Sequence, residues 1–389
     1  MKKLRMKVAV IIVNYRLKYF LEQTLLSVAE AAEGFDCTTI VVDNASGDDS
    51  IDFLRPRFPN VTFIENSKNV GFSRANNQGF AAAARADFIL VLNPDTIIGR
   101  RTIRDCLDWM ESHSDCVAIG VRMLDGNGQF LPESKRSFPS IWNSFCKLFG
   151  LSKLFPRSRV FARYHLRYLP ENEPNIVPVL AGAFMFIRNS RLREVGGFDE
   201  DFFMYGEDMD LAYRLAQDGW NNYYLPTPII HYKGECTKTE SADYVKIFYG
   251  AMHIFYRKHY PRRQWLSRLF ITPAIGARML MSLINKKVVK PLARLFHCGN
   301  GKSLPAYVVS DNADILATAA AEGFGSDRCQ LVNSIEEVPA DEACNIILDD
   351  SRLTYEEIID TIDRNSSSRR LFHIYSSRNA LIISPKKQR

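Results

Sequence analysis

Short apolar runs rich in β-branched residues alternate with helical patterns through the first third of the chain. This alternation is the strongest constraint on the fold, because continuous apolar strands separated by helices form a parallel sheet covered on both faces. The expected strands are 8–13, 38–42, 61–65, 88–92 and 117–121, with helices at 17–32, 49–57, 73–85 and 101–113. The sequence therefore predicts an α/β fold with a mostly parallel central sheet.

Polar side chains follow three of these strands where each strand ends. Asn14 comes after the first strand, Asp43 after the second, and Asn93 and Asp95 after the fourth. In open α/β sheets, ligands bind where the loops leave the carboxyl ends of the strands. We therefore expect these residues to share one site.

The strand and helix alternation breaks over residues 125–178, which are rich in aromatic residues, Arg and Pro. We expect this insertion to lie over the edge of the sheet. Regular patterns return as a strand at 182–188, a helix from about Glu207, two strands (NYYLP and PIIHY), and a helix at about 240–260. These patterns complete a first domain of residues 1–260.

Two further segments follow this domain. Residues 261–298 interleave Lys and Arg with large apolar residues at helical spacing, the pattern of a helix in the interface of an anionic membrane. A helical linker with a solvated basic face is the alternative. Residues 299–389 carry the patterns of a small C-terminal α/β module whose role the sequence does not indicate.

Composition narrows the cellular setting. The eight cysteines are scattered without a C-x-x-C pair, which predicts reduced thiols in a cytosolic protein. No apolar run approaches the roughly 20 residues that cross a bilayer. The formal net charge of +6 is modest, and we expect no nucleic-acid partner.

Two motifs near the first strands suit a nucleotide. In VVDNASGDDS, a capped turn into a helix explains the Ser and acidic residues after Asp43, but it does not need Asp43 itself. A carboxylate at a strand tip can accept the imide N–H of a pyrimidine base or ribose hydroxyls. In NVGFSRANNQGF, helix packing explains the small residues and leaves Arg74 for a base or a phosphate.

The motif LVLNPDT ends a strand with a turn that leaves Asp95 at the edge of the sheet. Mg²⁺ takes few protein carboxylates and fills its other positions with water and substrate phosphates. One aspartate beside a diphosphate suits that requirement, although Asn-Pro-Asp is also a good turn. His231 lies at a later strand tip and is a plausible second metal ligand, although a lone His in a strand is more often structural.

The strongest motif is GGFDEDFFMYGEDMDLAYR. Aromatic residues accompany its acids, so the segment is expected to enter a pocket. Glu207 and Asp208 stand at the expected start of a helix, where negative charge is favoured. A carboxylate there can take a proton from an attacking hydroxyl; a simple acidic cap is the alternative.

Taken in order, these motifs resemble glycosyltransferase family 2 over about residues 7–260. Two further motifs belong to the same series: IIVNYR precedes VVDNASGDDS, and GAFMFIR lies between LVLNPDT and GGFDEDFFMYGEDMDLAYR. Within the family they look like the bacterial rhamnosyltransferase branch. The resemblance implies the GT-A nucleotide-diphospho-sugar fold and a divalent metal, Mg²⁺ or Mn²⁺. By matching position, Asp43 would contact the base, Asp95 the metal, Asp208 would be the catalytic base, and His231 would contact the metal or the diphosphate.

The resemblance predicts an inverting, non-processive enzyme of cell-surface polysaccharide synthesis, with dTDP-rhamnose or a UDP-hexose as donor. We expect Asn14, Arg74 and Asn93 to contact the nucleotide sugar as well, and Glu207 and Tyr205 to lie on the acceptor side. The acceptor would be a glycan, lipid-linked at the cytoplasmic face of the cell membrane.

Two departures from the family pattern matter. The family's D-x-D position carries Asn93-Pro-Asp95, so only one carboxylate is offered, and the Q-x-x-R-W motif of processive synthases is absent. Nucleotidyl transfer on the same fold and an inactive sugar-nucleotide or glycan-binding protein are the alternative functions.

Overall fold

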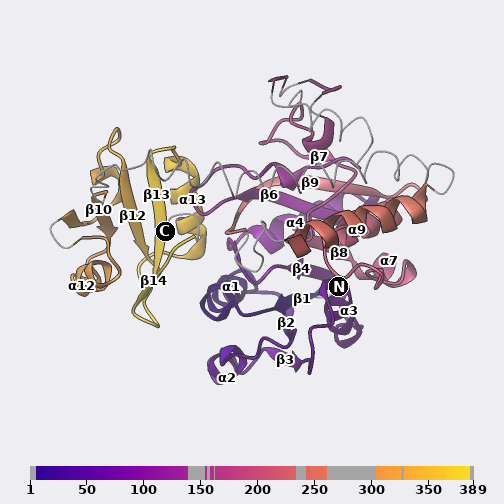
Figure 1. Cartoon of the computed structure of the whole chain (residues 1–389), viewed down its shortest axis with the longest axis horizontal. Coiled ribbons are helices and arrows are strands. Elements are labelled where there is room, and N and C mark those ends of the chain that lie inside the picture. The colour runs from indigo at the N-terminus through magenta and orange to yellow at the C-terminus, as the bar shows by residue number, and fades with distance from the viewer. Residues whose placement is uncertain are drawn as a thin grey trace, which may run out of the picture.

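The computed structural model describes residues 6–138, 154–155, 158–161, 163–233, 242–260, 304–325 and 328–385. The strands among these residues form two sheets that lie beside each other (Figure 1). The expected insertion at 125–178 is described only in part, and the basic segment 261–298 falls outside the described residues.

Half of the first sheet is parallel, as the apolar runs predict. Its strands are β1 (Lys7–Asn14), β2 (Asp36–Asp43), β3 (Thr62–Glu65) and β4 (Phe88–Leu92), in the order β3-β2-β1-β4. The helices among them are α1 (Lys18–Ala31), α2 (Ser50–Leu54), α3 (Phe72–Ala82) and, further along the chain, α4 (Thr102–Ser112). The register pairs Asn14 with Asp43, so these two residues meet at the carboxyl edge.

The other half of this sheet is mixed. It continues from β4 through β8 (Phe184–Arg188), β6 (Cys116–Leu124) and β9 (Asn221–His231) to β5 (Thr96–Ile98), with β7 (Asn175–Ile176) paired to β9. β8 is antiparallel to both of its neighbours, whereas β6 and β9 are parallel. The expectation of two strands around Pro226 was wrong: β9 is continuous, and a register shift opposite Val121 and Arg122 absorbs the Pro-Thr-Pro sequence.

Shorter elements complete this part of the chain. They are the 3₁₀ turns η1 (Pro132–Ser134) and η2 (Arg163–His165), and the helices α7 (Asn189–Glu194), α8 (Glu207–Leu215) and α9 (Ala242–His259).

Apolar clusters lie on both faces of the first sheet. Val10 and Ile12 of β1 share a buried cluster with Leu21 and Leu25 of α1, whereas Ile11 faces a second cluster on the other side. That second cluster includes α3, which packs so closely that a Cβ at Gly79 would lie 2.3 Å from a methyl carbon of Ile11. The predicted α/β class, with helices on both faces, is therefore confirmed.

The second sheet belongs to the C-terminal part of the chain. Its strands are β10 (Ala306–Val309), β11 (Cys329–Val332), β12 (Cys344–Asp349), β13 (Arg370–Ser376) and β14 (Leu381–Ile383), in the order β11-β10-β12-β13-β14. The first four are parallel and β14 is antiparallel to β13. With α12 (Asp314–Ala321), η6 (Ile335–Glu337) and α13 (Tyr355–Asn365), they form a small α/β module, and α13 lies on the side toward β9 (Figure 1).

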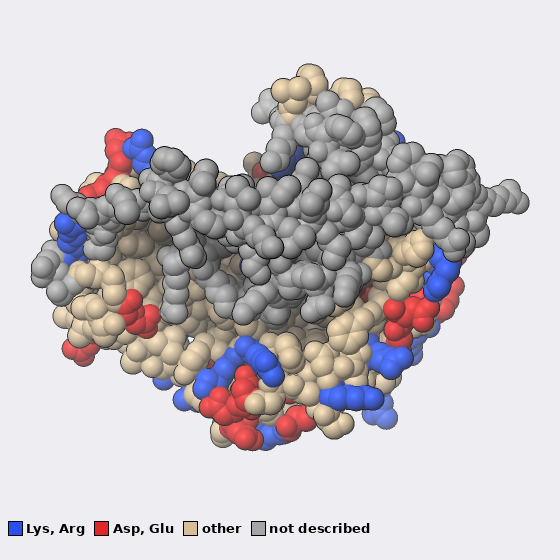
Figure 2. Space-filling model, viewed as in Figure 1, with Lys and Arg blue, Asp and Glu red and all other residues tan. Residues whose placement is uncertain are grey.

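Three further observations concern the cysteines, the helices and the surface charge of the described residues. The five described cysteines are free thiols. Among the described helices, none combines the length and the apolar character needed to cross a membrane. On the face shown in Figure 2, the Lys and Arg side chains of described residues mostly lie beside Asp and Glu side chains, so no wide basic patch is visible on the described part of that face.

Candidate active site

Asn14 and Asp43 form a fixed polar pair at the carboxyl ends of β1 and β2. The Asn14 amide donates to Asp43 Oδ1 over 2.8 Å, and the Ser46 hydroxyl donates to the same oxygen over 2.5 Å. The backbone N–H of Ser46 donates to Asp43 Oδ2 over 3.0 Å. These bonds hold the Asp43 carboxylate in one orientation at the strand tip.

A cavity of about 430 Å³ opens beside this pair. It lies between the end of β2, the first turn of α2 and the residues that follow β3, and its walls include the side chains of Asp43, Asp48 and Glu65. Carboxylates accept hydrogen bonds and repel phosphate oxygens. The cavity therefore suits the N–H and O–H donors of a nucleoside better than it suits the phosphates.

Asn93, Asp95 and His231 come together at the same edge of the sheet. Nε2 of His231 lies 3.3 Å from the Asn93 amide nitrogen and 3.4 Å from Asp95 Oδ1. β5 and β9 bring this about, because their register pairs Thr96 with His231 and the N–H of Tyr232 donates to the Asp95 carbonyl over 3.0 Å. Residues 138 positions apart thus meet through one short strand pairing.

This group fits a divalent metal that is completed by substrate. Asp95 Oδ1 is buried and has no hydrogen-bond partner among the described residues, and the His231 ring faces it with Nε2. Within the described ranges, no group of three or more His, Cys, Asp or Glu side chains could hold a metal on its own. An ion held by Asp95 and His231 would therefore keep several positions for water and phosphate oxygens, as Mg²⁺ does in phosphate sites.

Asp208 lies at the first turn of α8, after two consecutive residues with left-handed backbone, Tyr205 at φ 66° and Gly206 at φ 84°. Its Oδ2 accepts hydrogen bonds from the Arg136 guanidinium over 2.5 Å and from the Gly182 N–H over 3.1 Å. Its Oδ1 accepts from the N–H of Met209 over 2.8 Å. Both oxygens of the Asp208 carboxylate therefore have hydrogen-bond donors.

Sequence reasoning missed Arg136. This residue lies in the insertion, where a backbone bridge to Val179 fixes it, and its guanidinium also donates to the Leu180 carbonyl over 2.8 Å. A single arginine in an irregular segment has no informative spacing, so no sequence signal could have identified it.

Glu207 precedes Asp208 and lies in a more buried environment. Its side chain is buried, and its Oε2 has no hydrogen-bond partner among the described residues. Burial raises the pKa of Glu207 well above the usual carboxyl range, and the adjacent Asp208 carboxylate raises it further.

The two sides of the site meet at the start of β8. The N–H of Gly182 donates to Asp208, and the carbonyl of the next residue, Ala183, accepts from the N–H of Asn93 over 3.0 Å. The acidic helix start and the Asn93 group are therefore joined through two adjacent residues.

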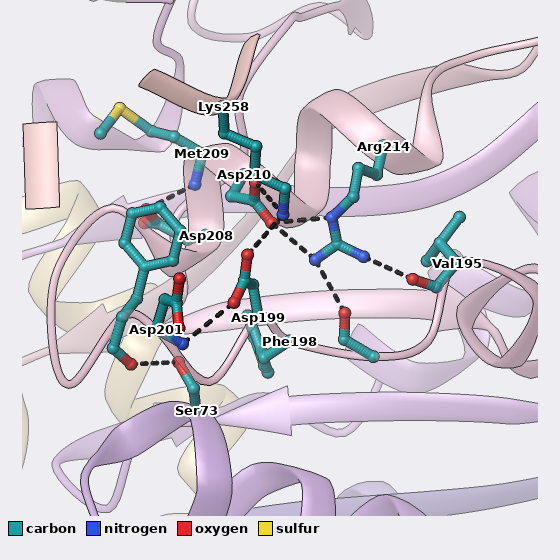
Figure 3. A network of polar contacts seen from close by, with 12 residues as sticks. Ser73, Val195, Phe198, Asp199, Asp201, Asp208, Met209, Asp210, Arg214 and Lys258 are labelled. Atoms are coloured by element: carbon teal, nitrogen blue, oxygen red, sulfur yellow. Dashed lines mark hydrogen bonds and ion pairs between the residues drawn. The ribbon is translucent and has the colours of Figure 1, made fainter. Parts of the chain in front are cut away.

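Asp210, the last acid of the same motif, has a structural role (Figure 3). It is fully buried and accepts from Arg214 over 2.7 Å and from Lys258 over 2.9 Å. It also accepts from His259 over 2.7 Å. These contacts join α8 to α9. They lower the pKa of Asp210 to about 2, although burial opposes the shift.

Two predicted site residues have other neighbours. Arg74 is 57% exposed and forms an ion pair with Glu200 over 3.0 Å. The Tyr205 side chain packs against an apolar cluster that includes Phe202 and Phe255. Their contacts with donor and acceptor stay predictions.

Residues 9–195 match the family described as glycosyl transferase family 2. The N-acetylglucosaminyl-diphospho-decaprenol L-rhamnosyltransferase of Mycobacterium tuberculosis is 30% identical over 259 residues, which cover 63% of this chain and 82% of that relative. The chain belongs to glycosyltransferase family 2. Within the family it is rhamnosyltransferase-like, because the rhamnosyltransferase WbbL of Escherichia coli is also similar, at 29% identity over 42% of this chain and 61% of WbbL.

Among solved structures, this glycosyltransferase is similar to a mannosyltransferase from Pyrobaculum calidifontis in complex with GDP-Man and Mn²⁺. The TM-score is 0.46 and the identity 16%, over 82% of this chain and 81% of the other. A likeness of this size carries no argument about ligands. In the glycosyltransferase described here, Asp43 and Asp95 lie inside the matched family region, and Asp208 and His231 lie beyond it.

Proposed function

We propose that this glycosyltransferase is an inverting, non-processive enzyme that moves one sugar from a nucleoside-diphosphate donor to a hydroxyl of a glycan acceptor. The observation that carries the proposal is the meeting of Asp208 and the Asn93 group at Gly182 and Ala183. A single displacement needs a base on one side of the reacting carbon and support for the leaving group on the other.

The donor would lie along the carboxyl edge of the first sheet. The nucleoside would enter the acidic cavity beside Asn14 and Asp43, with its diphosphate near Asn93, Asp95 and His231. When bound by Asp95 and His231, Mg²⁺ or Mn²⁺ supplies positive charge that neutralises the leaving diphosphate.

The acceptor would approach from the side of Asp208. The Asp208 carboxylate takes the proton of the acceptor hydroxyl, and the oxygen bonds to the anomeric carbon of the donor sugar. The bond from that carbon to the diphosphate breaks on the opposite face, and the diphosphate leaves with the electron pair. Attack from the opposite face inverts the anomeric configuration.

The rhamnosyltransferase relatives favour dTDP-rhamnose as the donor, with UDP-hexoses as the next candidates. The name of the Mycobacterium tuberculosis relative specifies a lipid diphosphate acceptor, which supports a lipid-linked acceptor and a role in cell-surface polysaccharide synthesis here.

The central experiment replaces Asp208 by Asn and measures sugar transfer, donor hydrolysis and nucleotide binding. We expect turnover to fall by roughly 10²–10⁴-fold, the usual value of a positioned general base, with binding nearly unchanged. Asp201→Asn is a matched control, because Asp201 belongs to the same motif but its side chain is 69% exposed. Turnover of the Asp208 variant within a few-fold of the parent would assign the base to another residue.

A lipid-linked acceptor implies work at the inner face of the cell membrane. The basic segment 261–298, which lies outside the described residues, would make this contact, at about 1 kcal/mol per basic residue near an anionic leaflet. Vesicles that contain anionic lipid should therefore sediment the protein at low salt, and changing Lys286, Lys287 and Lys290 to Glu should weaken this. A protein that stays in the supernatant at low salt would make the segment an internal linker.

A further inference from the structure

The strand that carries the Asp95 side of the site has little support of its own. β5 is three residues long, and among the described strands it pairs with the end of β9 alone. Its two faces pack into different parts of the molecule: Ile98 belongs to the core of the first sheet, whereas Ile97 belongs to a cluster formed largely by the C-terminal module. Ile230 and Tyr232, on either side of His231, lie in that same cluster.

Helix α1 holds the backbone on both sides of Asp95. The Thr24 hydroxyl donates to the Pro94 carbonyl over 2.9 Å and accepts from the Thr96 N–H over 3.3 Å. One turn further along, the Ser27 hydroxyl accepts from the Ile98 N–H over 3.3 Å. The position of Asp95 therefore depends on where α1 lies.

The C-terminal module contacts α1 from the other side. Glu30 accepts a hydrogen bond from the backbone N–H of Tyr355 over 3.1 Å, at the start of α13. The buried carboxylate of Glu22 accepts from the side-chain amide of Asn379 and from Arg57. α13 also contacts β5 and β9 directly.

Further contacts fix the module against the end of β6. Arg122 and Asp363 form two parallel hydrogen bonds of 2.6 and 2.9 Å, and both side chains are largely buried. The N–H of Phe372 donates to the side chain of Asn127 over 3.1 Å. Close approach is required here, because a Cβ on Gly128 would lie 2.6 Å from the carbonyl oxygen of Ile362.

We infer that the C-terminal module, residues 304–385, is a brace that positions Asp95 and His231 for the donor diphosphate and its metal. The inference rests on the proposed function. Its physical basis is that the pairing of β5 with β9 is only three residues long, which is too short to fix Asp95 against His231 by itself. The shared apolar cluster and the hydrogen bonds through α1 supply the additional support. Asp363 and Arg122 are then positioning residues that act at a distance from the site.

The test compares Asp363→Ala with Asp360→Ala in the full chain. Both aspartates lie on α13, but Asp360 forms its ion pair with the exposed Arg364 of the same helix. The first readout is hydrogen exchange without any ligand, at the amides of Thr96, Ile98 and Tyr232. Faster exchange of these amides is expected in Asp363→Ala and not in the control.

The second readout is the affinity for UDP and for dTDP, measured by calorimetry with Mn²⁺ and with chelator. We expect Asp363→Ala to weaken the Mn²⁺-dependent affinity by roughly 2- to 30-fold, the range of coupling between distant sites, and to leave the affinity in chelator unchanged. Equal affinities of the two variants, together with faster exchange within the module, would overturn the inference.

The proposed function fails on a different result. A parent protein that binds neither UDP nor dTDP would contradict the proposed function, whether or not the module positions Asp95. If Asp363→Ala does not fold, Asn127→Ala removes a smaller contact of the same interface. A normal Mn²⁺-dependent affinity in that variant, despite faster exchange at β13, would also overturn the inference.

Discussion

The two sides of the proposed active site hold their carboxylates in different ways. On the proposed base side, Asp208 accepts from Arg136, Gly182 and Met209, and Asp210 accepts from Arg214, Lys258 and His259. On the proposed metal side, Asp95 Oδ1 is buried without a hydrogen-bond partner among the described residues. Because buried polar atoms are normally satisfied, the Asp208 and Asp210 carboxylates are complete within the protein, whereas Asp95 keeps an oxygen that a ligand can complete.

The largest effect is expected at Asp210. Asp210→Asn leaves Arg214 and Lys258 without their buried counter-charge, so the free energy of unfolding should fall by about 3–5 kcal/mol. Urea unfolding measures this, with Asp201→Asn as the exposed control, expected within about 0.5 kcal/mol of the parent. Equal stability of the two variants would show that the base side is not held by Asp210.

Arg136 tests whether the orientation of Asp208 matters separately from its charge. Arg136→Met should lower turnover by about 10²-fold, as expected when a reacting group is displaced by about 1 Å. Nucleotide affinity should stay unchanged, and Arg136→Lys should recover part of the turnover. An equal loss of affinity and turnover would place Arg136 on the donor instead.

A variant at Asp95 tests whether its buried carboxylate holds a metal. Asp95→Ala should weaken Mn²⁺-dependent nucleotide binding by at least about 10-fold, since even indirect metal partners contribute that much. The affinity in chelator should not change, because the nucleoside cavity is intact. Full transferase activity of the parent in excess chelator would contradict the proposed need for a metal.

The last prediction concerns Glu207, whose raised pKa makes stability depend on pH. The neutral carboxyl is compatible with its buried position, so its contribution is complete below the ordinary carboxyl pKa and is lost as the pH rises through the raised pKa. Between about pH 5 and 8, the parent should therefore lose stability relative to Glu207→Gln, by at most about 1.4 kcal/mol per pH unit. Parallel stability curves from urea unfolding would mean that Glu207 is charged in the folded protein.

Much of the fold was predictable because its signals are local. The five apolar runs of the first half all became strands, and Glu207 begins α8 as expected. The strand around Pro226 was not predicted correctly, since a register shift depends on the neighbouring strand β6. The pairing of β5 with β9, which unites Asp95 with His231, had no local signal.

The sequence by itself determined which chemistry is available: a carboxylate at each of two strand tips, an acidic helix start and a histidine at a later strand end. Only the tertiary structure decided which of these groups work together and in what state. Arg136 reaches Asp208 across 72 positions, and burial rather than residue type raises the pKa of Glu207. Helix α1 contacts both Pro94, next to Asp95, and Tyr355 of the C-terminal module. Charge state and orientation depend on neighbours in space, and those neighbours are distant in the chain.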